Sequence, residues 1–167
     1  MGRIGQAVAK RAKPFGISIH YHNRKQLPSS IEETYEATYW NNLDEMIRWM
    51  DVISINCPLT KETKGLMSKN RLQSMMQDSY LINTSRSEII DENALLYLLK
   101  TNRIAGAGLD VFRKIKNRNS DLLKAPNTIL IPHMGSATVE GRIEMGEKVI
   151  INIKTFIDGH NPPNRII

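Results

Sequence analysis

The chain has 167 residues, a single cysteine and a formal net charge of +6 at pH 7. This length suits one domain that buries its own core without disulfides or metal, and Cys57 is expected to be a small buried hydrophobe. No apolar run reaches the roughly 18 residues that span a bilayer, and the N-terminus has no signal-peptide pattern, so we expect a cytoplasmic protein without a membrane partner. Basic residues are scattered apart from a cluster at 113–118 that lacks interleaved aromatic residues, which argues against a nucleic-acid partner.

Helix-forming and strand-forming segments alternate along the first third of the chain. Apolar residues at helical spacing predict a helix over 5–13, and alternation predicts a strand over 17–21. A loop is expected at 28–30, where proline and two serines meet. Asn42 is placed to cap a helix, and a β-branched run predicts a strand over 52–55. The helix after Asn42 is expected to turn Leu43, Met46, Ile47 and Met50 inward.

The rest of the chain continues this alternation. The expected elements are a short helix capped by Ser68, a strand over 80–83, a helix capped by Asp91, strands over 104–111 and 128–131, and a long helix that begins at Thr138 and is closed by Gly159. Alternating strands and helices are typical of βαβ units around a parallel sheet. The predicted fold class is therefore α/β, with helices on both faces of a Rossmann-like parallel sheet.

The first residues match the end of a phosphate-binding motif. Met1-Gly2-Arg3-Ile4-Gly5 looks like the last part of G-x-G-x-x-G without its first glycine. In that motif the backbone approaches a pyrophosphate, and the N-terminus of the following helix attracts the anion. Such a partial match also fits an ordinary helix start, and that alternative stays open. If the motif is real, Gly2, Arg3 and Ile4 contact the cofactor.

Two histidines are spaced to share one face of a strand. His20 and His22 therefore raise the question of a metal, but two ligands without a third are insufficient. We expect both side chains to face solvent, and we predict no metal site.

Four segments further along carry a more specific signal. They occur in order at 51–60 (Asp-Val-Ile-Ser-Ile-Asn-Cys-Pro-Leu-Thr), 82–87 (Ile-Asn-Thr-Ser-Arg-Ser), 106–112 (Gly-Ala-Gly-Leu-Asp-Val-Phe) and 132–138 (Pro-His-Met-Gly-Ser-Ala-Thr). This set resembles the D-2-hydroxyacid dehydrogenase family, especially its glyoxylate and hydroxypyruvate reductase branch. The similarity runs along essentially the whole chain. It implies an NAD(P)-binding domain over 1–167 that is incomplete at its N-terminus, lacks the first strand and exposes sheet edges, with the substrate domain absent.

The resemblance also implies the catalytic residues. Arg86 matches the arginine that holds the substrate carboxylate, and His133 matches the histidine that donates a proton to the carbonyl oxygen of a small 2-keto acid. The alternatives are a surface salt bridge for Arg86 and an ordinary loop histidine for His133.

Further positions are expected to line the cofactor. Pro58 and Thr84 match residues on the nicotinamide side of the cleft, and Gly135 is also expected to bind the cofactor. Asp110 matches the aspartate that faces the carboxamide, although it would also serve as a turn cap.

The residues after the second strand of the nucleotide fold bear on the choice of cofactor. NAD-preferring folds usually place a carboxylate there, but this chain has Asn23 followed by Arg24. An uncharged side chain beside an arginine accommodates a 2′-phosphate, so NADP is favoured and NAD is the alternative.

Two positions depart from the family pattern. The second catalytic acid of the family is a glutamate where this chain has Ile115, so the histidine lacks the negative charge that favours its protonated form, and we expect poor turnover. Ser87 replaces a glycine, which casts doubt on the backbone near Arg86. The alternative to an impaired reductase is a non-catalytic remnant that binds nucleotide or a homologous subunit. The family also implies a homodimer.

Overall fold

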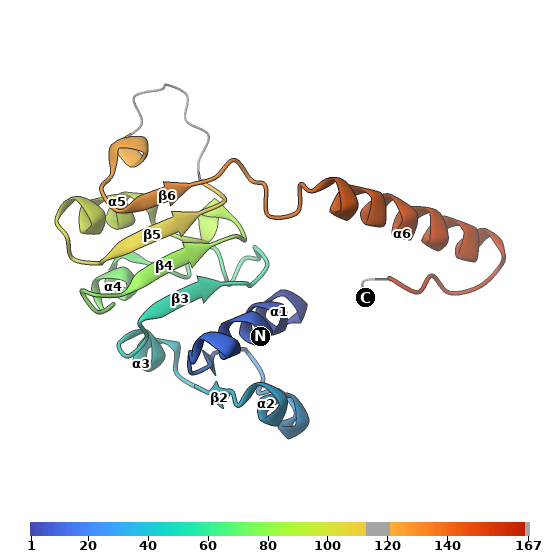
Figure 1. Ribbon diagram of the computed structural model, residues 1–167, viewed down its shortest axis with the longest axis horizontal. Helices are drawn as coiled ribbons and strands as arrows, with labels where there is room; N and C mark the ends of the chain where they lie inside the picture. The colour runs from blue at the N-terminus through green and yellow to red at the C-terminus, as the bar shows by residue number, and fades with distance from the viewer. Residues whose placement is uncertain (113–120, 166–167) are drawn as a thin grey trace. The chain divides into compact units, whose positions relative to one another are not determined.

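The computed structural model describes residues 1–112 and 121–165 of the chain, coloured from the N-terminus to the C-terminus in Figure 1. These residues form two compact units, Met1–Ile131 and Pro132–Ile167, and each is described by itself.

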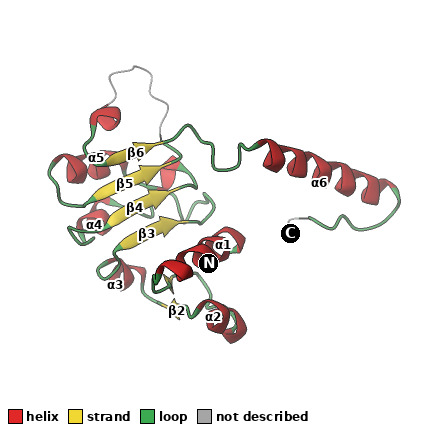
Figure 2. Ribbon diagram, viewed as in Figure 1, coloured by secondary structure: helices red, strands yellow, loops and turns green. Residues whose placement is uncertain are grey.

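The core of the first unit is a parallel sheet of four strands, shown in yellow in Figure 2. The strand order is β3-β4-β5-β6, and the bounds are β3 Val52–Ile55, β4 Tyr80–Asn83, β5 Gly106–Leu109 and β6 Thr128–Leu130. Alternate side chains of each strand point to opposite faces. On β3, for example, Ile53 and Ile55 are buried while Val52 is 51% exposed.

Helices pack against one face of this sheet and form the core with it. They are α3 (Leu43–Ile47), α4 (Lys69–Gln73) and α5 (Glu92–Lys100). Two short 3₁₀ segments also occur, η2 (Ser87–Ile89) between β4 and α5 and η3 (Asp121–Lys124) between β5 and β6. Most of the apolar residues of the helices are buried against the strands, because removing this surface from water is the main force that holds such layers together. The centre of the core comprises Ile47, Leu72, Leu81, Leu95, Leu99 and Leu109.

A second, smaller parallel sheet precedes the first in sequence. It pairs β1 (His20–Tyr21) with β2 (Thr38–Tyr39), and α1 (Arg3–Ala12), η1 (Lys13–Phe15) and α2 (Ser29–Tyr35) accompany it. Within the described residues, no hydrogen-bonded strand joins β1 to β3.

The smaller sheet differs from the sequence prediction in two places. The strand predicted over 17–21 is only two residues long, and a helix, α2, stands where a loop was predicted at 28–30. Pro28 precedes this helix, and the Tyr21 hydroxyl donates a hydrogen bond of 2.6 Å to Glu32 Oε1 on it. Two serines at the start of α2 have a low intrinsic helix propensity. The contact between Tyr21 of β1 and Glu32 therefore helps to stabilise this helix.

The predicted helix caps are confirmed. Asn42 accepts from the backbone N–H of Asp44, Ser68 from Arg71, Asp91 from Ala94 and Thr138 from Gly141. Each cap satisfies a backbone donor that the first turn of a helix leaves unpaired. Met46 and Ile47 are buried as predicted, and Leu43 and Met50 are partly buried against the core.

The strand predicted over 104–111 is shorter in the structure, Gly106–Leu109, and its glycines have a packing role. A Cβ built on Gly106 would lie 2.6 Å from the Asn127 carbonyl oxygen and 3.2 Å from the Tyr80 ring. Only glycine allows β5 to approach its neighbours so closely at this position.

The second unit consists mainly of α6, Val139–Ile157. Thr138 caps its first turn, and Gly159, at φ +78°, follows its last turn as predicted. None of the nineteen residues of α6 is buried. A search of the described helices finds none with the length and apolar character of a membrane span.

Candidate functional site

The register of the main sheet brings several predicted site residues to one edge. Ile55 of β3 pairs with Asn83 of β4, and Asn83 pairs with Leu109 of β5. All three strands end at this level, and neighbouring strands are about 4.8 Å apart. We call this the carboxyl edge. It carries residues 56–58, 84–86 and 110, and ligands of open parallel sheets bind at such edges.

Asn83 organises the loop that follows β4. Its side chain is fully buried, its Nδ2 donates to the Arg86 carbonyl oxygen at 2.9 Å, and its Oδ1 accepts from the Ser85 backbone N–H at 2.9 Å. Its own carbonyl oxygen accepts from the Asp110 N–H at 2.9 Å. From the sequence, Asn83 was recognised only as part of a motif. The available signal was its position two residues after the buried Leu81, which places both side chains on the same face of β4.

Arg86 has a fixed backbone and an exposed side chain. Its guanidinium Nη1 donates to the Ser85 carbonyl oxygen at 2.7 Å, and the remainder of the planar fork is available to a ligand. The Ser85 hydroxyl donates to the Cys57 carbonyl oxygen, which ties the loop after β4 to the loop after β3. The doubt raised by Ser87 is removed, because Ser87 begins η2 and does not have a positive φ.

The nicotinamide-side candidates differ in exposure. Pro58 and Thr84 are exposed, and the Pro58 carbonyl oxygen accepts from the Thr63 hydroxyl at 2.6 Å. Asp110 is only 3% exposed. Cys57 is half-buried rather than fully buried, and this burial raises the pKa of its thiol. A raised thiol pKa makes Cys57 a poor nucleophile at neutral pH.

The N-terminus of α1 has the features of an anion site. Gly2 is the N-cap, no side chain caps the helix, and its first turn has no acidic residue. A Cβ on Gly2 would meet nothing within 4 Å, so the backbone is open to a ligand. Arg3 and Ile4, the next two residues, are exposed. Uncapped N–H groups and the helix dipole favour a phosphate here.

An unsatisfied polar atom lies beside this helix. Asn56 follows β3, and its Oδ1 is buried without a hydrogen-bond partner among the described residues. A Cβ on Gly5 of α1 would lie 4.0 Å from the Asn56 Cβ, so the two are neighbours. A buried acceptor without a partner calls for a ligand donor, and a dinucleotide carries hydroxyl and amide donors. The residues at this edge therefore fit the predicted cofactor.

Asn23 and Arg24, the residues predicted to bind the ribose end of the cofactor, follow β1. The Asn23 side-chain oxygen accepts a hydrogen bond from the Met1 ammonium, and its backbone oxygen accepts from the Tyr39 hydroxyl at 3.2 Å. Burial lowers the pKa of that ammonium group. Arg24 is exposed and adds to the lowering of the pKa of Glu62, which comes chiefly from a hydrogen bond with Thr60.

The remaining predicted residues belong to the second unit or lie outside the described residues. His133 and Gly135 belong to the second unit, where both are exposed and His133 has a φ of +54°. Ile115 and the basic cluster at 113–118 lie outside the described residues.

The two histidines near β1 both contact Trp40. His20 Nδ1 accepts from Trp40 Nε1 at 3.1 Å, and His22 Nδ1 lies 2.9 Å from the Trp40 carbonyl oxygen. His20 is exposed, as predicted, while His22 is half-buried. No group of three or more metal-ligating side chains occurs in the described part of the chain.

Comparisons with known proteins agree with this geometry. The family model described as "D-isomer specific 2-hydroxyacid dehydrogenase, NAD binding domain" matches residues 1–135. The chain belongs to this family. As a member, it has a nicotinamide-nucleotide-binding domain of Rossmann-like α/β fold, as predicted.

Individual relatives of this dehydrogenase-family chain are reductases. It is 44% identical over 165 residues to a glyoxylate reductase of Thermococcus litoralis, covering 99% of this chain and 49% of that protein. A glyoxylate reductase from Paecilomyes thermophila matches with a TM-score of 0.85 and 37% identity, over 93% of this chain and 46% of that one. An NADPH-dependent glyoxylate/hydroxypyruvate reductase of Sinorhizobium meliloti, solved with NADP and malonate, matches with a TM-score of 0.84 and 37% identity, over 93% and 47%. The chain thus spans about half the length of these relatives.

Proposed function

We propose that this chain is the nucleotide-binding part of a reductase that transfers hydride from NADPH to a small 2-keto acid such as glyoxylate or hydroxypyruvate. The observation that carries the proposal is the carboxyl edge of a chain that belongs to this dehydrogenase family. This edge carries Arg86 with a fixed backbone, a buried Asp110, and an Asn56 side-chain oxygen that has no hydrogen-bond partner among the described residues. The names of the reductases described above support the substrate class.

The proposed cofactor contacts divide among three groups of residues. Gly2, Arg3 and Ile4 would hold the pyrophosphate at the start of α1, and Asn23 with Arg24 would hold the adenosine ribose and its 2′-phosphate. Pro58, Thr84, Asp110 and Gly135 would line the nicotinamide side. When bound, the nicotinamide supplies the hydride.

The proposed catalytic residues act on the keto acid. Arg86 binds the substrate carboxylate through the free part of its guanidinium fork, and this orients the carbonyl carbon. His133 donates a proton to the carbonyl oxygen. With Ile115 in place of the glutamate of the family, no carboxylate from that position favours the protonated imidazole, so we propose slow turnover.

The preference for NADPH has a direct test. Asn23→Asp adds a negative charge where the 2′-phosphate would bind, so the ratio of NADPH affinity to NADH affinity should fall by about tenfold or more, equivalent to about 1.4 kcal/mol. Fluorescence titration with both nucleotides measures the ratio. Asn41→Asp, the same change at an exposed position after β2, is the matched control. An unchanged ratio in Asn23→Asp would defeat the NADP assignment.

Turnover is tested by following NADPH oxidation with glyoxylate and with hydroxypyruvate. Wild type should bind NADPH and turn over slowly, Arg86→Gln should lose glyoxylate-dependent oxidation while retaining nucleotide binding, and Ile115→Glu should increase the rate. Nucleotide binding without oxidation in both wild type and Ile115→Glu would favour the alternative of a non-catalytic nucleotide-binding protein. Absence of nucleotide binding would refute the proposal.

A further inference from the structure

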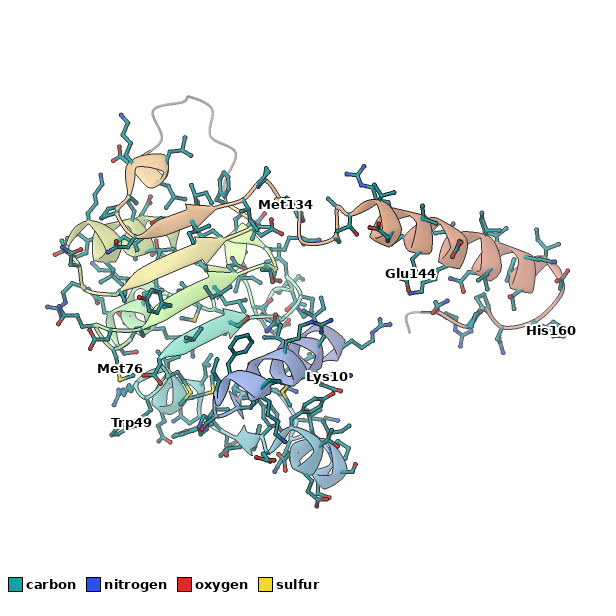
Figure 3. The ribbon with its side chains drawn as sticks, viewed as in Figure 1. Lys10, Trp49, Met76, Met134, Glu144 and His160 are labelled. Atoms are coloured by element: carbon teal, nitrogen blue, oxygen red, sulfur yellow. The ribbon has the colours of Figure 1, made fainter. Side chains whose placement is uncertain are left out.

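Two segments of the first unit meet at the start of α1. In one of them, Asn23 accepts a hydrogen bond from the Met1 ammonium, and the Met1 side chain lies 3.2 Å from a Cβ built on Gly5. In the other, the Asn56 Cβ lies 4.0 Å from the same position. Figure 3 shows the side chains around α1, on which Lys10 is labelled. The segment that contains Asn23 and the one that contains Asn56 are therefore neighbours at the proposed cofactor site.

Glu62 lies in a turn after β3 that hydrogen bonds hold in shape. The turn begins at Pro58, whose carbonyl oxygen accepts from the Thr63 hydroxyl at 2.6 Å, and the Thr60 backbone N–H donates to the same hydroxyl at 2.8 Å. The Thr60 hydroxyl also donates to Glu62 Oε2 at 2.7 Å. An exposed glutamate side chain usually has many rotamers open to it. This one is instead held by a neighbour in the loop that carries Pro58.

The charge of Glu62 interacts with that of Arg24, the residue after Asn23. The hydrogen bond from Thr60 is the main cause of the lowered pKa of Glu62, and the positive charge of the exposed Arg24 adds to the lowering. Glu62 is therefore ionised at neutral pH, and the two opposite charges attract each other.

Glu62 is also the only acidic residue of the turn at 58–65. The other charged residues of this turn, Lys61 and Lys64, are exposed and basic. A dinucleotide is an anion, so both lysines favour its approach. Glu62 is the one charge of the turn that opposes a phosphate group.

We infer that Glu62 is a specificity-determining residue that competes with the 2′-phosphate of NADPH for Arg24. The inference rests on the proposed function, because it concerns the cofactor site assigned there. A phosphate that pairs with Arg24 must replace the attraction of the Glu62 carboxylate. NADH has no phosphate at this position, so its binding does not involve the competition. Glu62 thus lowers the affinity for NADPH selectively and limits the preference that Asn23 and Arg24 create.

Fluorescence titration of the purified chain with NADPH and with NADH tests the inference. Glu62→Gln should raise the affinity for NADPH about fivefold and change that for NADH by less than about twofold. Glutamine keeps a side-chain oxygen that accepts from Thr60, so the turn is preserved. Glu33→Gln, at an exposed position on α2, removes the same charge and should change neither affinity by more than about twofold. Equal gains for the two nucleotides, or no gain for NADPH, would overturn the inference.

A double-mutant cycle tests whether Arg24 is the group in competition. In an Arg24→Gln background, Glu62→Gln should raise the affinity for NADPH by less than about twofold, because the contested guanidinium is gone. A full gain in that background would show that Glu62 repels the phosphate directly, and would overturn the competition. A wild-type chain that binds neither nucleotide would overturn the proposed function together with this inference. A ratio of affinities that Asn23→Asp shifts and Glu62→Gln does not would overturn this inference alone.

Discussion

Asn83 and Asn56 stand at the ends of neighbouring strands, yet their side-chain oxygens have different surroundings. Asn83 Oδ1 accepts from Ser85, and its Nδ2 donates to Arg86, so its hydrogen bonds are made within the chain. Among the described residues, Asn56 Nδ2 donates to Ser54, at 3.2 and 3.3 Å, and Asn56 Oδ1 is buried with no hydrogen-bond partner. The loop after β4 is therefore positioned by contacts within the chain, whereas the end of β3 leaves one buried acceptor that a ligand would be able to use.

The two positions should respond differently to alanine. Asn83→Ala leaves the Ser85 N–H and the Arg86 carbonyl without their buried partner. An unmet buried hydrogen-bonding group costs about 1–3 kcal/mol, so we expect the free energy of unfolding to fall by about 2–4 kcal/mol in urea titrations. Asn70→Ala, at an exposed position on α4, should change it by less than about 0.5 kcal/mol. A loss from Asn83→Ala no larger than that of Asn70→Ala would contradict the positioning role.

Asn56→Ala should reverse the pattern. It removes an acceptor whose desolvation is not repaid, so the unfolding free energy should stay within about 0.5 kcal/mol of wild type or rise. Nucleotide affinity should fall about tenfold, equivalent to about 1.4 kcal/mol, because the ligand loses its acceptor. Calorimetric titration with NADPH measures this, with Asn70→Ala again as the reference. If Asn56→Ala weakens folding but not binding, the oxygen is not reserved for a ligand.

Ser85 joins the two sides of the comparison, because its hydroxyl donates from the loop after β4 to the carbonyl oxygen of Cys57 after β3. Ser85→Ala should lower the unfolding free energy by about 1 kcal/mol, the usual net value of one hydrogen bond. Ser87→Ala provides the control, since that hydroxyl contacts only the exposed Glu88 carboxylate at 3.1 Å. Thermal unfolding of both variants would reveal the difference, and equal shifts would mean that the cross-connection contributes nothing.

Much of this edge was predictable because its signals are local. The strands over 52–55 and 80–83 match β3 and β4 residue for residue. The helix caps were recognised from single polar residues that immediately precede segments with apolar residues at helical spacing. Arg86 was predicted from a motif of adjacent residues, and its role stays a prediction.

The features that escaped prediction depend on contacts between distant residues. Helix α2 is supported by the Tyr21–Glu32 hydrogen bond, and the state of Asn56 depends on α1 lying beside it. Neither contact joins residues that are neighbours along the chain, so local sequence patterns do not reveal it. The turn propensity of the residues at 28–30 predicted a loop instead.

The smallest expected effect concerns the helices that lead into the two strands. Asp44 of α3 accepts from Arg71 of α4 through Nε at 2.6 Å and Nη2 at 3.3 Å, and this hydrogen-bonded pairing lowers the pKa of the Asp44 carboxyl. A carboxyl with a lowered folded-state pKa stabilises the fold above its unfolded pKa of about 3.9, and this contribution is lost as pH falls through the folded value.

Because the Asp44 side chain is 55% exposed, solvent screens the pair, and Asp44→Asn should cost only about 0.5 kcal/mol at neutral pH. The difference from wild type should shrink as the pH drops below about 4. Asp78→Asn, at another exposed aspartate, serves as the reference for a simple change in net charge. A difference that persists undiminished in acid would show that Asp44 acts as a neutral hydrogen-bond partner at the start of α3, and that its ion pair with Arg71 does not stabilise the contact between α3 and α4.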